Sequence, residues 1–105
     1  MTDQATKSGL GIAALIGNHR AEILSIAHQY KAHNIRVFGS VARGEARIDS
    51  DIDFLVTFEP GYTLLDHAGL VVALRDLLGR SVDVVNEPFL RDGYRDPILH
   101  DAIPL

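Results

Sequence analysis

The sequence predicts a small α+β domain in which helices pack mainly on one face of a small mixed β-sheet. Segments with apolar residues at helical spacing alternate along the chain with three short apolar runs that suit β-strands. Three strands among four helical segments give a sheet with one face left open. A chain of 105 residues, 47% of them hydrophobic, is the right size for one modest core, so residues 1–105 are expected to form a single domain.

The N-terminal part of the chain is predicted to be helical. Residues 1–8 are polar and are expected to be frayed or disordered. Between residues 10 and 33 the apolar side chains recur at mostly helical spacing, and Asn18 suits an N-cap that divides this region into a short helix and a longer one. His33 and Asn34 are expected to end the longer helix, and residues 35–38 form the first predicted strand.

The remaining elements are delimited by turn and capping residues. They are a short helical turn, a strand, an amphipathic helix, a strand and a C-terminal helix, over residues 40–43, 51–58, 63–79, 81–86 and 96–103. Gly79 suits the C-cap of the amphipathic helix, because glycine readily adopts the left-handed conformation found there. Asp96 followed by Pro97 is typical of an N-cap and first helical residue.

Composition excludes several classes of protein. The chain has no cysteine, so disulfide and thiol chemistry are excluded. Its apolar runs are far shorter than the roughly 20 residues that span a bilayer, and the start shows no secretion signal, so a cytoplasmic protein without membrane contact is expected. The net charge is −4, and its basic residues are scattered among acids, which weighs against direct binding of a nucleic acid.

The residues with the clearest chemical signal lie in one stretch. Gly39 and Ser40 follow the first predicted strand, and Asp51 and Asp53 open the second after ten intervening residues. Alternate residues of a strand share a face, so the two carboxylates are expected about 6–7 Å apart on one face. A divalent cation would relieve their repulsion, and a Gly-Ser turn offers N–H groups and a hydroxyl to phosphate. The pattern indicates metal-assisted chemistry on a nucleotide.

The acidic segment has two other interpretations. Acids at positions 49, 51 and 53 resemble the start of an EF-hand loop, but Phe54 stands where glycine is needed and Pro60 where a bidentate glutamate is needed, so this is rejected. A solvated acidic turn remains open, although it does not explain the spacing from Gly39.

The run from Gly39 to Gly44 together with Ser50–Asp53 resembles the signature of the DNA polymerase β-like nucleotidyltransferase superfamily, and most of all the minimal nucleotidyltransferases. The resemblance implies that family's fold and an enzyme that transfers a nucleotide, with ATP as substrate and two Mg²⁺ ions as cofactors. It implies Asp51, Asp53 and a later acid, Asp83, as metal ligands and catalytic residues.

The resemblance also implies which residues bind the nucleotide. Gly39 and Ser40 would hold the β- and γ-phosphates. Arg43 has two interpretations, a contact with phosphate or an ion pair with Glu45 or Asp49. Asp83 could alternatively pair with Arg80 or cap a turn.

Members of this family often act as MntA-type antitoxins encoded beside a HEPN-domain toxin. The leading hypothesis is therefore a protein adenylyltransferase that moves AMP from ATP to a hydroxyl, a tyrosine in family members, of a HEPN-domain partner. One alternative is a non-catalytic antitoxin that neutralises its partner by binding alone. Another is a subunit of a nucleotidyltransferase that modifies small molecules.

Overall fold

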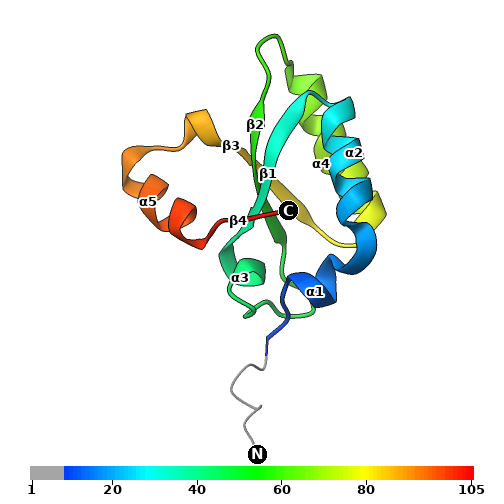
Figure 1. Ribbon diagram of the computed structural model, residues 1–105, viewed down its shortest axis with the longest axis vertical. Helices are drawn as coiled ribbons and strands as arrows, with labels where there is room; N and C mark the ends of the chain where they lie inside the picture. The colour runs from blue at the N-terminus through cyan, green and yellow to red at the C-terminus, as the bar shows by residue number, and fades with distance from the viewer. Residues whose placement is uncertain (1–8) are drawn as a thin grey trace, which may run out of the picture.

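Four β-strands form one mixed sheet in the computed structural model, which describes residues 9–105 (Figure 1). The strand order is β3-β2-β1-β4, with β1 antiparallel to β2 and β4, and β2 parallel to β3. The strands are β1 (Ala32–Phe38), β2 (Ile52–Phe58), β3 (Val82–Asn86) and β4 (Ile103–Pro104). The sheet confirms the predicted α+β class. The expectation of a frayed N-terminus concerns residues 1–8 and lies outside the described residues.

Helices connect these strands, and the two longest of them cover one face of the sheet. They are α1 (Ile12–Leu15), α2 (Arg20–Gln29), α3 (Gly39–Ala42), α4 (Leu64–Leu78) and α5 (Asp92–Asp101), with 3-10 turns η2 (Gly17–His19) and η3 (Glu87–Phe89). The two long helices α2 and α4 lie side by side, whereas α5 lies across the sheet from them (Figure 1).

The hydrophobic core lies between the sheet and helices α2 and α4. Along β2, Ile52, Phe54 and Val56 are fully buried on the face toward the long helices, while on the other face Asp53 is partly exposed and Leu55 is buried. This alternation follows from the period of two in a strand, and it puts the acid on the face away from the long helices. The helices contribute further buried side chains to the core, including Ile23, Leu70 and Leu74.

Helix α4 has the boundaries that its capping residues predict. The Thr63 side chain accepts a hydrogen bond from the Asp66 N–H, and the Asp66 carboxylate accepts one from the Thr63 N–H at 2.9 Å, which is a capping box. Gly79 ends the helix with φ +67°, the left-handed conformation that a C-cap requires.

The boundary between α2 and β1 differs from the prediction. The helix ends at Gln29 rather than at His33, and β1 begins at Ala32 rather than at residue 35. Lys31 and Asn34 both adopt positive φ, so the chain turns out of the helix early, and an irregularity in the strand register follows between His33 and Arg36.

The predicted cap at Asn18 is also wrong. This residue lies inside the 3-10 turn η2, and the residue at the N-cap of α2 is His19, whose side chain makes no capping hydrogen bond. Asn is common in tight turns and also at helix N-caps, so the residue type alone does not distinguish a turn from a cap.

The C-terminal segment differs most from the prediction. Helix α5 begins at Asp92, so Pro97 lies inside it and not at its first position. Strand β4 was not predicted, because its two residues gain hydrogen bonds only by lying beside β1. The backbone N–H of Leu105 donates to Ile35 O at 3.0 Å and fixes the end of the chain against β1.

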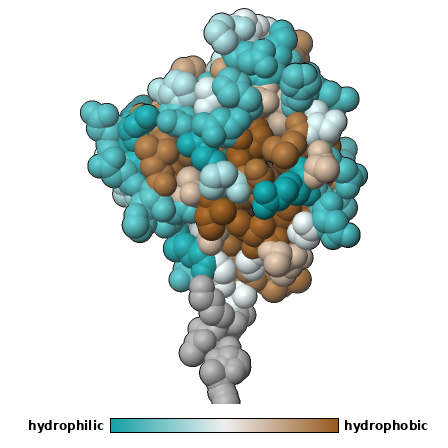
Figure 2. Space-filling model, viewed as in Figure 1, coloured by the Kyte–Doolittle hydropathy of each residue, from teal (hydrophilic) through white to brown (hydrophobic). Residues whose placement is uncertain are grey.

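Hydrophobic side chains gather at the centre of the face in Figure 2, and polar side chains surround them. The centre corresponds to the region where β4 runs beside β1, and Ile103 of β4 is 40% exposed. Across residues 9–105, no helix has the length and apolar character needed to cross a bilayer.

Candidate functional site

Two of the three predicted acids lie directly beside each other on the sheet. Strands β2 and β3 are parallel, and Asp53 is the register partner of Asp83. Register partners in a sheet are separated by the strand spacing of about 4.8 Å and point to the same face. The structure thus joins residues 30 positions apart in the sequence into one acidic pair.

The environment of Asp53 disfavours its charged form. The half-buried carboxyl loses hydration, and the negative charges of Asp83 and Asp51 act on it in the same direction, so its pKa rises from 3.8 to about 6. The positive charge of Arg43 acts in the opposite direction. The other two predicted acids and the predicted phosphate-binding arginine therefore all act on the Asp53 carboxyl.

Gly39 makes close contact with this carboxyl. Phe38 at the end of β1 pairs with Asp53, and Gly39 follows with φ +75° as the first residue of α3. A Cβ atom at position 39 would lie 2.5 Å from Asp53 Oδ2, which is too close for any real contact. Glycine is required here for its conformation and for its missing side chain. Ser40 is the next residue of α3, so the Gly-Ser turn lies directly beside the acids.

The loop before β2 is held by polar contacts. The Arg47 N–H donates to Ser50 Oγ at 2.8 Å, and Arg80 Nη1 donates to Ser50 O at 3.1 Å. Pairing with Arg80 is one sequence interpretation of Asp83, but within residues 9–105 no ion pair joins the two residues. Its contact instead supports the backbone one residue before Asp51.

Arg43 lies between two carboxylates. Its Nε donates to Glu45 Oε1 at 2.9 Å, and its Nη1 donates to Asp101 Oδ2 at 2.6 Å. Both hydrogen bonds raise the pKa of Arg43 above its ordinary value, Glu45 first and then Asp101. The ion pair with Glu45 considered from the sequence is present. Sequence analysis missed Asp101, because it lies 58 residues from Arg43 and only the fold joins them.

The three acids have side chains that can bind Mg²⁺, but they do not form a preformed metal site. Carboxylate oxygens are the ligands that Mg²⁺ prefers, and a cation would offset the repulsion at Asp53. In the part of the chain that the structure describes, no three His, Cys, Asp or Glu side chains are placed as metal ligands. The assignment of Asp51, Asp53 and Asp83 as ligands therefore stays a prediction.

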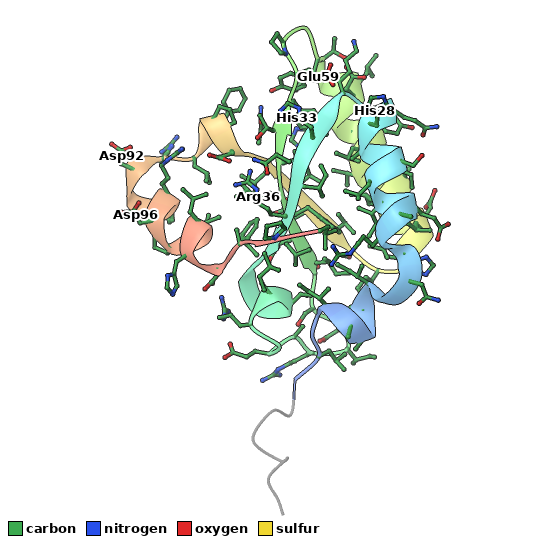
Figure 3. All side chains as sticks on the ribbon, in the orientation of Figure 1. His28, His33, Arg36, Glu59, Asp92 and Asp96 are labelled. Carbon is green, nitrogen blue, oxygen red and sulfur yellow. The ribbon has the colours of Figure 1, made fainter. Side chains whose placement is uncertain are left out.

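Other ionisable side chains lie away from these acids. His28, His33 and Glu59 are found at the end of the sheet where β1 begins, while Gly39 follows the opposite end of that strand (Figure 3). Asp92 and Asp96 lie on α5 at the margin of the molecule (Figure 3).

The raised pKa of Asp53 predicts how stability depends on pH in the absence of metal. The folded state holds the proton more tightly than the unfolded state, so the free energy of unfolding should fall as pH rises from about 4 to about 6. The cost of the ionised carboxyl is absent below this window and complete above it. Because solvent screens the half-buried group, we expect an effect of about 1 kcal/mol.

Asp53→Asn isolates this effect, because the amide stays neutral at every pH. Urea unfolding of both proteins in chelator should give similar free energies at pH 4 and a more stable variant at pH 7. If the two proteins differ in free energy of unfolding by the same amount at both pH values, the predicted repulsion at Asp53 is contradicted.

Comparison with known proteins places these residues in a family context. A family model described as nucleotidyltransferase domain matches residues 21–105. The chain is 36% identical over 92 residues to the protein adenylyltransferase MntA of Thermococcus cleftensis, and the match covers 88% of this chain and 90% of that protein.

Solved structures resemble this one in fold. A structure described as a minimal nucleotidyltransferase superposes with a TM-score of 0.79 at 51% identity, over 93% of this chain and 99% of that one. A toxin–antitoxin structure with AMP-PNP gives a TM-score of 0.69 at 21% identity, over 80% of this chain and 69% of that one. These likenesses confirm the fold that the sequence motif implied.

Proposed function

The chain belongs to the nucleotidyltransferase domain family, and from this premise we propose that it is a protein adenylyltransferase acting as an antitoxin. In this proposal the hydroxyl of a tyrosine on a HEPN-domain toxin attacks the α-phosphorus of ATP, takes up the AMP group and displaces pyrophosphate. The name of the Thermococcus relative supports AMP as the transferred group and a protein as the acceptor.

One observation carries the proposal: the Gly-Ser turn and the acids meet at a single point. Gly39 lies against the Asp53 carboxyl, and Asp83 lies beside Asp53 in the adjacent strand. A protein that acts by binding alone needs neither a left-handed glycine packed against a carboxylate nor a half-buried acid with a raised pKa. Such features cluster at catalytic sites.

The side chains have separate tasks in this proposal. Ser40 and the backbone N–H groups of the turn hold the β- and γ-phosphates, because N–H and O–H groups donate to phosphate oxygens. Arg43 adds a positive charge at the same place. Asp83, exposed at the edge of the site, accepts the proton of the attacking hydroxyl.

The acids would also hold the metal. Asp51, Asp53 and Asp83 would bind two Mg²⁺ ions, and when bound Mg²⁺ supplies charge neutralisation at the triphosphate and at the attacking oxygen. The repulsion among the three acids is the feature of this chain that fits them to cations.

The acceptor would be presented by a partner protein. Two aromatic side chains lie exposed at the start of the C-terminal segment, Phe89 at 71% and Tyr94 at 67%. Leu90 and Ile98 of the same segment are only partly exposed. Exposed aromatic side chains are the kind that protein interfaces bury, so they support a docking surface here.

The test is transfer to the protein encoded by the adjacent reading frame. Incubating both proteins with ATP and Mg²⁺ should add whole adenylyl groups to the partner, visible in its intact mass. Omitting Mg²⁺ should abolish the addition, because carboxylates alone cannot neutralise the triphosphate.

Asp51→Ala supplies the control that separates catalysis from binding. The variant should still bind the partner but add no mass to it. If Asp51→Ala neutralises the partner as well as the wild type does, with no mass change in either case, the protein acts by binding alone. Addition of AMP to a small molecule and not to the partner would instead support the small-molecule alternative.

A further inference from the structure

Helix α5 is attached to the rest of the domain by two sets of charged contacts. None of its residues is fully buried, and its apolar residues Ile98 and Leu99 are partly buried. It contacts β1 and α3 on the side of the sheet that α2 and α4 leave uncovered. The charged contacts lie near its two ends and have different partners.

The first set of contacts is centred on Glu87 in the turn before α5. Its carboxylate accepts a hydrogen bond from Arg36 of β1 at 2.5 Å and another from Arg95 of α5 at 3.2 Å. Arg36 points from β1 toward this segment (Figure 3). The network connects the start of α5 to the sheet and does not include any residue assigned to the nucleotide.

The second contact connects the end of α5 to the candidate site. Asp101, the last residue of the helix, accepts the hydrogen bond from Arg43 Nη1. The Arg43 backbone is already fixed, since its N–H donates to Gly39 O at 3.1 Å at the end of α3. With the backbone fixed, only the direction of the long Arg43 side chain can vary.

The geometry points to Asp101 as a positioning residue that aims the Arg43 guanidinium at the phosphates of the nucleotide. This inference rests on the proposed function, because it takes Arg43 to be a phosphate ligand. Glu45 holds the same guanidinium, but its side chain is 62% exposed and it lies only two residues from Arg43. The Asp101 side chain is 23% exposed and belongs to a different element.

These differences determine which carboxylate matters more. The Glu45 hydrogen bond raises the pKa of Arg43 more than the Asp101 bond does, but an exposed ion pair between neighbours in sequence is strongly screened by solvent and restrains the guanidinium less. A shorter, less exposed pair from α5 restricts the arginine more. The fork of the guanidinium then reaches phosphate with less loss of side-chain entropy on binding.

The test measures MgATP binding by calorimetry and the KM and kcat of transfer to the partner. Asp101→Asn should raise the Kd and the KM for ATP about tenfold, because a pre-oriented ligand contributes similarly before and during reaction. The value of kcat should change less than about threefold. Asp101→Glu, which keeps the charge, should recover most of the affinity.

Glu87→Gln is the matched control, because it loosens the start of α5 without touching Arg43. It should leave the Kd for MgATP within about twofold of the wild type. Adding Asp101→Asn to Arg43→Ala should cause no further loss, because the aspartate acts only through that arginine.

Three results would overturn the inference. The first is an equal loss of affinity in Glu87→Gln, which would mean that Asp101 merely docks α5. The second is tighter binding in Asp101→Asn, which would mean that Asp101 competes with phosphate. The third is a further loss of MgATP affinity, as large as in the wild-type background, when Asp101→Asn is added to Arg43→Ala. A wild-type chain that binds MgATP but modifies no partner rejects the proposed function, and the binding constants still decide the role of Asp101.

Discussion

Asp53→Ala is expected to lower the rate of AMP transfer by about a thousandfold or more while the protein remains folded. Asp53 is the carboxyl on which the other acids, Arg43 and Gly39 converge, so its loss removes the centre of the electrostatic site. The same change should not weaken the fold, since the charged carboxyl is held against its preference. Transfer to the partner by intact mass and thermal unfolding in chelator measure the two effects.

Asp49→Ala is the control for this variant. Asp49 is an exposed acid of the same segment, four residues earlier, so the change removes one negative charge without touching the site. Its transfer rate should stay within about twofold of the wild type. If Asp53→Ala kept a rate close to that of Asp49→Ala, the assignment of Asp53 to the chemistry would be wrong.

Gly39→Ala should have the second largest effect, on transfer and on stability together. The residue has φ +75°, which costs a side-chain-bearing residue about 1–2 kcal/mol. The new methyl group would also collide with the Asp53 carboxylate, which must then move. A displacement of about 1 Å in a catalytic group can cost about a hundredfold in rate, and we expect a loss of that size.

Gly79→Ala separates the two effects of that variant. Gly79 has a similar φ of +67°, but an added Cβ would meet nothing within 4 Å, and it caps α4. The variant should lose a comparable amount of stability in urea unfolding and keep its transfer rate. A large loss of transfer in Gly79→Ala would show that backbone strain alone, and not contact with Asp53, explains the result at Gly39.

Local sequence determined those features that depend on neighbouring residues. The cap of α4 at Thr63 and its end at Gly79 follow from hydrogen bonds and dihedral angles within a few residues. The alternation that buries Phe54 and puts Asp53 on the face away from α2 and α4 follows from strand geometry. The spacing between Gly39 and Asp53 also indicated the family. Antiparallel pairing of β1 with β2 brings residues at this spacing together.

Tertiary structure decided the features that depend on distant partners. Strand β4 exists only because two residues find hydrogen bonds on β1, and α5 extends back to Asp92 although Pro97 suggested a later start. No local rule connects Asp101 to Arg43 across 58 residues, nor puts Asp83 in register with Asp53. Short-range propensities fix capped helices and alternating strands, whereas ion pairs and strand registers depend on how the folded chain brings remote segments together.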